Sequence, residues 1–275
     1  MAQNLFFPKI DQNLWQRFIE TFDNEERFSI GLSSQDAQKY IPLNNIKLTN
    51  SFFNWNKKFL TSDDIIVVIG NLDIYDTDKK EIVFKEITSK KVFCKVRILY
   101  IDTLNIPIQE LSQIIGSYTK EIEIAKVYSN ITFAEIIRNT PNIEVLKIFH
   151  NNWISKQATW LEDLYKYKEG NNFRELLIHL DIIEFDIETL KKFVETKSVS
   201  GVIIKIRYEN REKRKAFHQF AGKMSELFNE RNYPKYDETS YINLEFYGTR
   251  DFKCFTLDMN KNDRPPLIKR QKINK

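Results

Sequence analysis

The sequence predicts an α/β fold in which short parallel strands alternate with helices that pack on one side of the sheet. Two observations predict it: an apolar pattern that recurs from Val96 onward, and helical periodicity between its copies. A third observation narrows the class, because 7 Gly in 275 residues argues against Gly-rich phosphate loops and dinucleotide sites. With 42% hydrophobic residues, the chain has the composition of a folded protein.

The recurring pattern has the form apolar-x-x-apolar-x-apolar. Its copies begin at residues 96, 119, 143, 173 and 201, which are 23, 24, 30 and 28 residues apart, and the second copy has Thr119 in the first position. This spacing is close to the leucine-rich-repeat period of about 20 to 29 residues. Stacked units of this kind predict a curved sheet with helices on its outer face. The alternative is an ordinary α/β sheet whose hydrophobic spacing is accidental.

Helices are expected after most of these strands, each from residues that form one apolar face. Asp186 is a candidate N-cap for the third helix. Two last strands, at 242–247 and 252–257, would cap the open end of the sheet. The apolar faces of the four helices are Ile108, Leu111, Ile114 and Ile115; Phe133, Ile136 and Ile137; Ile187, Leu190, Phe193 and Val194; and Ala216, Phe217, Phe220, Ala221, Met224, Leu227 and Phe228.

The chain before the repeats divides into two parts. Residues 7–41 have short apolar stripes that predict three small helices, the last of which ends before Pro42. Residues 42–94 are β-rich and form either a connector or first, irregular repeats, with strands expected at 46–48, 65–69, 72–75, 82–87 and 92–94 and turns at Asn71 and 76–78. The expected units are therefore 7–41, 42–94, a repeat domain at 95–258 and a basic, disordered tail at 259–275.

The positive charge of the chain is concentrated in that tail. The net charge is +4, but residues 259–275 contain six basic residues and one acid, which leaves −1 for the remainder. A near-neutral body is unlike a nucleic-acid-binding domain, so we expect no nucleic-acid partner there. Lys269-Arg270-Gln271-Lys272 is by default part of a disordered end, with a nuclear import signal as the alternative. Basic residues at 211–215 indicate either an acidic partner or a solvated helix face.

Other features indicate a cytoplasmic protein. The two cysteines, Cys94 and Cys254, form no disulfide framework, which fits free thiols in a reducing compartment. The longest apolar run, at 65–69, is far shorter than a membrane span, and charged residues interrupt the N-terminus before a secretory segment could form. We therefore expect no membrane partner, and the nucleus is the alternative location.

No residue pattern predicts catalysis, a cofactor or a metal site. The histidines, His150, His179 and His218, have no Cys, Asp or Glu at metal-ligand spacing. The sequence also lacks a Walker loop and the motifs C-x-x-C, H-E-x-x-H and G-x-S-x-G. We therefore expect a protein that is not an enzyme and that needs no cofactor.

The repeats offer a surface for protein recognition instead. In a leucine-rich-repeat geometry, the residues between the apolar positions line the inner face of the curve. Phe149 and Leu177 are expected to lie exposed side by side there, and aromatic and Arg anchors dominate affinity in protein interfaces. A plain solvated sheet face is the alternative. The predicted substrate face consists of Tyr100, Lys147, Phe149, Leu177, His179, Lys205 and Arg207, with Asp102, Glu123 and Ala125 beside them.

The N-terminal residues resemble an F-box, especially the divergent form in nematode F-box proteins. The likeness lies in Phe7-Pro8-Lys9-Ile10, Leu14, Phe18-Ile19, Phe22-Asp23, Phe28, Ile30 and Leu32-Ser33-Ser34. The stretch 185–194, leading into 201–206, is similar to the end of the F-box-associated or FTH-type regions of that family. The Leu-Pro pair that begins the first helix in the family is here Ile10-Asp11.

This resemblance implies a substrate adaptor of an SCF-type (cullin–RING) ubiquitin ligase. Its N-terminal helices would bind a Skp-type adaptor, and its repeat region would select a protein substrate. By the same resemblance, the residues that divide between the core of the module and the adaptor interface are Ile10, Leu14, Phe18, Ile19, Phe22 and Phe28.

Two other classes of function stay open at this point. One is a leucine-rich-repeat-like interaction scaffold with no link to ubiquitin, which the missing Leu-Pro pair favours. The other is an enzyme, such as a nuclease that uses Asp76, Glu81 and Lys85. Charged strands often place such residues together by chance, and the scarcity of His, Cys and Gly argues against catalysis.

Overall fold

The computed structural model describes residues 46–51, 65–74, 92–102, 108–126, 131–150, 154–208, 211–231, 240–246 and 251–256, together with Leu14, Arg17 and Thr21. Within these ranges, strands and helices alternate between residues 98 and 224, and further strands lie before and after that stretch. They are β1 (Ile46–Ser51), β2 (Ile65–Ile74), β3 (Val92–Cys94), β4 (Ile98–Asp102), α5 (Ile108–Ile114), β5 (Glu121–Ala125), α6 (Phe133–Asn139), β6 (Val145–Phe149), η3 (Ile154–Lys156), α7 (Trp160–Tyr167), β7 (Phe173–Leu180), α8 (Ile187–Lys197), β8 (Ser198–Tyr208), η4 (Arg211–Lys213), α9 (Arg214–Met224), β9 (Asn229–Arg231), β10 (Tyr241–Phe246) and β11 (Phe252–Thr256).

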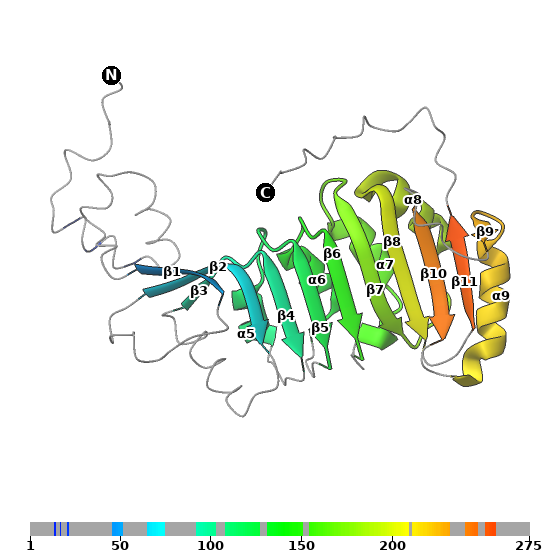
Figure 1. Ribbon diagram of the computed structural model, residues 1–275, viewed down its shortest axis with the longest axis horizontal. Coiled ribbons are helices and arrows are strands. Elements are labelled where there is room, and N and C mark those ends of the chain that lie inside the picture. Colours follow the sequence, from blue (N-terminus) through cyan, green and yellow to red (C-terminus); the bar gives the residue numbers. More distant parts are fainter. Residues whose placement is uncertain are drawn as a thin grey trace, which may run out of the picture.

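The strands form one sheet of eleven strands, in the order β1-β2-β4-β5-β6-β7-β8-β10-β11-β9, with β3 beside β2. Pairing is parallel from β1 to β10, and β11 and β9 add the antiparallel edge. From β4 to β8 each strand lies beside its successor, and α5 to α8 lie behind the sheet while α9 lies at its end (Figure 1). The predicted α/β class with a mostly parallel sheet is confirmed.

The repeat pattern forms the core of the sheet. The register pairs Leu99 with Ile122, Ile122 with Leu146, and Leu146 with Leu176, so equivalent positions of successive units lie side by side. Apolar side chains therefore stack along the whole array on the face that the helices cover, and burial of this kind is the main force that stabilises a fold. All three positions are buried in the first four copies: Val96, Leu99 and Ile101; Thr119, Ile122 and Ile124; Ile143, Leu146 and Ile148; and Phe173, Leu176 and Ile178.

The fifth copy departs from the pattern at its first position. The pairing of β7 with β8 joins Phe173 to Ser198 but Glu175 to Ile203, so β8 contains extra residues at this point. Gly201 lies within this bulge with φ +86°, and Val202 is the neighbour that is buried. A residue without a Cβ adopts a positive φ readily, which is why glycine suits the bulge.

The four predicted helices are confirmed as α5, α6, α8 and α9. Asp186 is the N-cap of α8, since its carboxylate accepts a hydrogen bond of 3.1 Å from the Glu188 amide. Thr132 and Glu135 form a capping box at the start of α6. Local residue types thus decide where these helices begin.

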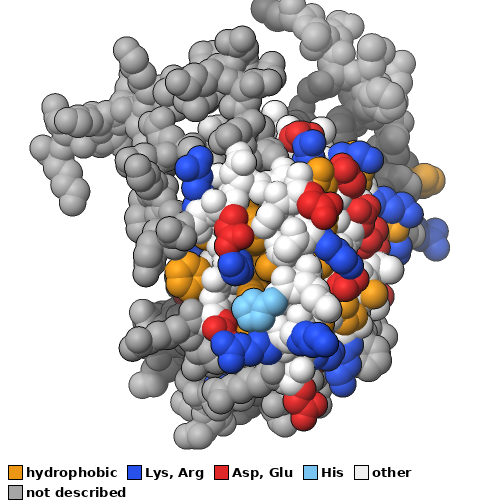
Figure 2. Space-filling view, turned by 90° about the vertical axis from the view of Figure 1, so that its right-hand side faces the viewer, with side chains coloured by type: hydrophobic (Ala, Val, Ile, Leu, Met, Phe, Trp, Pro, Cys, Tyr) orange, Lys and Arg blue, Asp and Glu red, His pale blue; other side chains and the backbone are white. Residues whose placement is uncertain are grey.

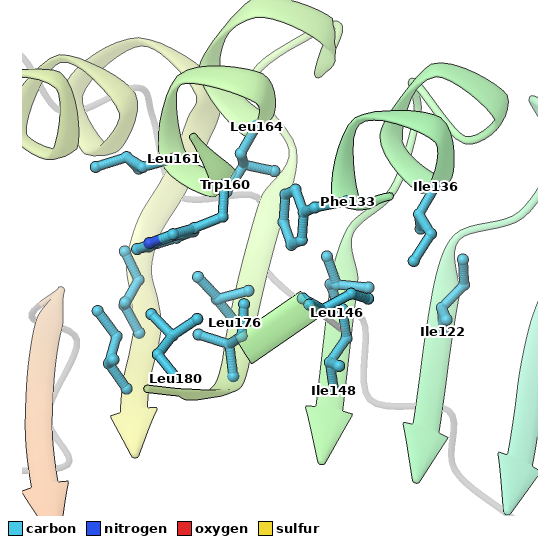
Figure 3. Packing of buried hydrophobic residues seen from close by; sticks show 14 of the residues in the cluster. Ile122, Phe133, Ile136, Leu146, Ile148, Trp160, Leu161, Leu164, Leu176 and Leu180 are labelled. Atoms are coloured by element: carbon cyan, nitrogen blue, oxygen red, sulfur yellow. The ribbon is translucent and has the colours of Figure 1, made fainter. Parts of the chain in front are cut away.

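Helix α7 was not predicted from the sequence. Trp160, Leu161 and Leu164 are fully buried on one side of it. Phe133 and Trp160 point from α6 and α7 toward the strand residues Leu146 and Leu176, and the two rings meet edge to face with centroids 6.2 Å apart (Figure 3). The spacing of the apolar residues in α7 is helical, so the sequence did contain the signal.

One strand prediction before the repeats was wrong. The structure has a single strand, β2, where two strands with a turn at Asn71 were expected. Each half of β2 has its own neighbour, because Ile66–Val68 pair with β3 and Asn71–Ile74 pair with β4. Because backbone groups in both halves of β2 form hydrogen bonds with a neighbouring strand, the chain continues through Asn71 without a turn.

The remaining strand predictions fall inside and outside the described ranges. β1, β3, β10 and β11 lie where strands were predicted, and β9 at the antiparallel edge was not foreseen. The strand predicted at 82–87, the turn at 76–78 and the tail at 259–275 lie outside the described residues.

Candidate protein-recognition surface

One face of the sheet is left uncovered by the described helices (Figure 1). We call it the open face: the side chains of β2, β4 to β8 and β10 that alternate with the buried core residues. In β4, for example, Leu99 and Ile101 are buried, whereas Ile98, Tyr100 and Asp102 are partly exposed. Successive side chains of a strand point to opposite faces, so the same five residues supply both core and surface.

The register arranges the open face in rows that cross the strands. The central row follows the pairs Asp73–Tyr100, Tyr100–Glu123, Glu123–Lys147, Lys147–Leu177, Leu177–Lys205 and Lys205–Asn243. A second row lies nearer the carboxyl ends of the strands, and we call it the carboxyl row for that reason. It contains Asp102, Ala125, Phe149, His179, Arg207 and Glu245. All seven residues of the predicted substrate face lie in these two rows.

Ion pairs join neighbouring strands within the open face. Lys147 Nζ lies 4.0 Å from Glu123 Oε2 and 3.5 Å from Glu175 Oε2, and Arg207 pairs with Glu245. Burial raises the pKa of the Glu123 carboxyl, while the charge of Lys147 lowers it and that of Glu175 raises it again. Such partly exposed pairs each contribute only about 0 to 1 kcal/mol, so they orient side chains more than they stabilise the sheet.

The prediction that Leu177 is exposed beside Phe149 was wrong. Phe149 is partly exposed, but Leu177 is only 7% exposed. Its neighbours in the central row are Lys147 and Lys205, and the methylene groups of lysine side chains cover apolar surface. Burial on this face depends on cross-strand neighbours, which the spacing along one strand does not reveal.

Three rings gather where β6 and β7 end. The ring centroids of Phe149 and His179 are 5.4 Å apart, and those of His150 and His179 are 4.6 Å apart, both edge to face. His179 is 3% exposed, and His150 leaves the strand with φ 47°. The sequence placed these histidines on neighbouring strands but at different offsets, and the turn at His150 is what brings the rings together.

A second polar cluster, at the amino ends of β5 to β8, was missed by the sequence analysis. Lys168 is fully buried, and its Nζ donates a hydrogen bond of 2.7 Å to Asn172 Oδ1 and another to the carbonyl of Glu169. Asn172 Nδ2 donates to Glu144 Oε1 at 3.1 Å, and Lys197 Nζ donates to the carbonyl of Lys168 at 2.8 Å. These hydrogen bonds connect the segment before β7 to Glu144, just before β6, and to Lys197, at the end of α8.

The charges of this cluster act on Lys168. The pKa of its ammonium group is lowered to about 8, first by burial and then by the positive charges of Lys120 and Lys197, while Glu144 and Glu169 act in the opposite direction. Because its donors are used within the protein, we assign the cluster a structural role.

The surface around α9 carries both signs of charge in mixed order (Figure 2). A shallow depression there is lined by Arg214, Lys215, His218 and Gln219. Arg214 Nε pairs with Asp251 at 2.9 Å, and Lys213 Nζ donates to the carbonyl of Asp181 at 2.6 Å. Because Arg214 and Lys213 already have partners within the protein, residues 211–215 fit the interpretation of a solvated helix face better than that of a site for an acidic partner.

The predicted adaptor-binding residues are mostly outside the described ranges. Leu14 is described: it is helical and 66% exposed. Ile10, Phe18, Ile19, Phe22 and Phe28 lie outside the described residues, as do Asp76, Glu81 and Lys85.

The described ranges also bear on metal binding, membrane crossing and thiol reactivity. No three His, Cys, Asp or Glu side chains there gather as metal ligands would. Among the described helices, none has the length and apolarity to cross a bilayer. Burial raises the pKa of the Cys94 thiol to about 12 and raises that of Cys254, so both thiols are protonated and poorly nucleophilic near neutral pH.

Asp73 is one of the open-face residues that the sequence analysis did not assign to this face; the others include Glu175, Asn243 and Glu245. It lies in β2, outside the five copies, and pairs with Tyr100 at the end of the central row. A signal was present, because Ile69, Leu72 and Ile74 have the spacing of the repeat, 27 residues before Val96.

Comparison with known proteins adds no relative: no protein-family model matches the chain, and no curated protein matches it. The candidate surface is therefore defined by the geometry of this chain.

Proposed function

We propose that this protein is a non-enzymatic recognition protein whose open face binds a protein substrate, and that it serves as the substrate adaptor of an SCF-type (cullin–RING) ubiquitin ligase. The observation that supports substrate recognition is the alignment of seven predicted residues in two adjacent rows of one uncovered sheet face. The mixture of aromatic, aliphatic and charged side chains in these rows is typical of protein interfaces.

The sheet is proposed to be a leucine-rich-repeat-like array, curved with its helices outside. Three features support this: strands β4 to β8 in chain order, a helix or short helical turn between them, and equivalent apolar residues stacked from unit to unit. Since β2 pairs with β4 in the same parallel sense, we propose that residues 42–94 are first, irregular repeats.

The link to a ubiquitin ligase is supported by the F-box resemblance of residues 7–41. Leu14 fits this proposal, because a helical leucine with 66% of its surface exposed is available to an apolar partner.

Co-purification of the full-length protein with a purified Skp-type adaptor tests this link. Leu14→Glu should abolish capture by placing a charge in the interface, whereas Arg17→Gln, an exposed change in a helical residue three positions on, should leave capture intact. Circular dichroism would establish that both variants are folded. Absence of capture by the unchanged protein would contradict the ubiquitin link.

The second candidate function is an interaction scaffold that binds protein through the same face without a ubiquitin ligase. The observation that favours it is Ile10-Asp11 in place of the Leu-Pro pair of the F-box family. It predicts that the protein retains a partner through the open face while failing to capture the Skp-type adaptor.

A further inference from the structure

Asp73 and Lys205 mark the ends of a stretch of the central row, and no side chain among the described residues neutralises their opposite charges. Asp73 lies at the β2 end and Lys205 lies five strands further on, in β8. Among the described residues, neither side chain has a hydrogen bond or an ion pair, although both are partly buried. Partial burial also raises the pKa of the Asp73 carboxyl.

The residues between Asp73 and Lys205 are either uncharged or paired with each other. Glu123 and Lys147 form an ion pair with each other, Tyr100 lies beside Asp73, and Leu177 lies beside Lys205. From Asp73 to Lys205, the row therefore begins with an acid, continues through an aromatic ring, a neutralised pair and an apolar side chain, and reaches a base. A complementary partner needs a cation at one end, an anion at the other and apolar groups between them.

The dimensions of the row define the length of that partner. Neighbouring strands are about 4.8 Å apart, so five steps span about 24 Å, and an extended chain covers that distance in about seven residues. The inner strands already use their backbone groups in the sheet, so a segment that crosses them is recognised through side chains.

We infer that the open face binds an extended protein segment with a basic residue at one end and an acidic residue about seven positions away, with apolar residues between. The basic residue lies over Asp73, the apolar residues lie over Tyr100 and over the lysine methylene groups that cover Leu177, and the acidic residue lies over Lys205. This inference rests on the proposed recognition function and names the chemistry of the substrate segment.

A second copy of the chain is a poorer occupant of this surface. A face about 24 Å wide and about 16 Å high, five residues along each strand, offers about 400 Å² per partner. Stable protein pairs bury about 800 Å² per partner. An extended segment needs less area because it contributes a few anchored side chains.

The test uses immobilised full-length protein and four pools of eight-residue synthetic peptides. All pools share randomised Leu, Phe, Ser and Thr in the middle, and their ends are basic and acidic, both basic, both acidic, or both neutral. We expect the basic–acidic pool to be retained about threefold to fivefold more than the others at 50 mM salt, as partly exposed ion pairs allow. Equal retention of all four pools, or preference for a pool of one sign, would overturn the inference.

Charge reversal at each end gives a gain of function that unfolding could not imitate. Asp73→Lys should shift the preference to the acidic–acidic pool, and Lys205→Glu should shift it to the basic–basic pool. The matched controls Lys192→Glu and Glu195→Lys, on exposed positions of α8 behind the sheet, should leave the preference unchanged. Unchanged preference in the two open-face variants would contradict the assignment of the row.

Two further measurements separate this inference from its alternatives. Sedimentation of the full chain should give the mass of a monomer, and a dimer that Asp73→Lys dissociates would assign the open face to a second copy instead. The Asp73→Lys and Lys205→Glu variants should still capture the Skp-type adaptor. For the unchanged protein, adaptor capture without a preference for the basic–acidic pool would overturn this inference alone, whereas that preference without adaptor capture would overturn only the ubiquitin link.

Discussion

The two faces of the sheet use the same strands in opposite ways. On the covered face, Leu99, Ile122, Leu146 and Leu176 form a line of equivalent apolar residues, so every unit repeats its neighbour. On the open face, the adjacent central row changes at each strand, from Asp73 through Tyr100 to Lys205. The comparison teaches that the repeat specifies packing on one side and leaves the other side free to differ.

The largest expected effect contrasts two adjacent residues of β6. Leu146→Ala should lower the free energy of unfolding by about 2 to 5 kcal/mol, because it leaves a cavity in a fully buried layer. Lys147→Ala, on the open face, should change it by less than about 1 kcal/mol. Urea unfolding followed by circular dichroism measures both. Equal effects of the two substitutions would mean that the faces do not divide the roles of core and surface.

A smaller effect separates the buried cluster around Lys168 from the ion pairs of the open face. The pKa of the Lys168 ammonium group is lowered in the folded protein, from 10.5 to about 8, so folding favours the uncharged amine. Stability from this group should therefore rise by about 2 to 3 kcal/mol as the pH increases from about 8 to about 10.5.

The measurement for Lys168 is the difference in unfolding free energy between the unchanged protein and Lys168→Met across that pH range. Taking the difference cancels other groups, such as Cys94, whose raised pKa acts in the opposite direction at alkaline pH. Lys147→Met, which removes a partly exposed lysine, should show no comparable rise. A flat difference for Lys168→Met would show that the ammonium group of Lys168 is well solvated.

The smallest of these effects concerns the helices of the covered face. Asp186→Ala should lower the free energy of unfolding by about 1 kcal/mol, because α8 loses its N-cap. Glu195→Ala, in the same helix but away from the cap, is the control. Guanidinium titrations of the two variants measure the difference.

The contribution of Asp186 should also depend on pH. Hydrogen bonds from the Thr189 hydroxyl and from the Glu188 and Thr189 amides lower the pKa of its carboxyl from the ordinary 3.8. The capping contribution is therefore complete above about pH 4 and is lost as the pH falls through the lowered pKa. An effect of Asp186→Ala that stays constant down to pH 2 would contradict capping by the ionised carboxylate.

Much of the fold followed from patterns along the chain. Val96, Ile143 and Phe173 begin units whose buried residues lie where the repeat predicts, and Asp186 caps the helix that it was expected to cap. Helix α7 was within reach by the same reasoning, since Trp160, Leu161 and Leu164 have helical spacing. Asp73 was also within reach, because Leu72 and Ile74 repeat the spacing of the later strands.

Other features could not be predicted in this way. Leu177 and His179 have the alternation of surface residues but are buried by neighbours from other strands. In the sequence, Lys168 resembles an ordinary surface lysine, but in the structure it is buried and forms hydrogen bonds with Asn172 and Lys197. Each case depends at least in part on residues that are distant in the sequence.

The sequence by itself determined which side of each strand and helix is apolar, because strand and helix periods are local properties of the backbone. It thereby determined the α/β class and most of the core. Only the tertiary structure decided the register that places Asp73, Tyr100, Glu123, Lys147, Leu177 and Lys205 in one row. The physical reason is that register and cross-strand burial are set by packing between units, and packing depends on every neighbour at once.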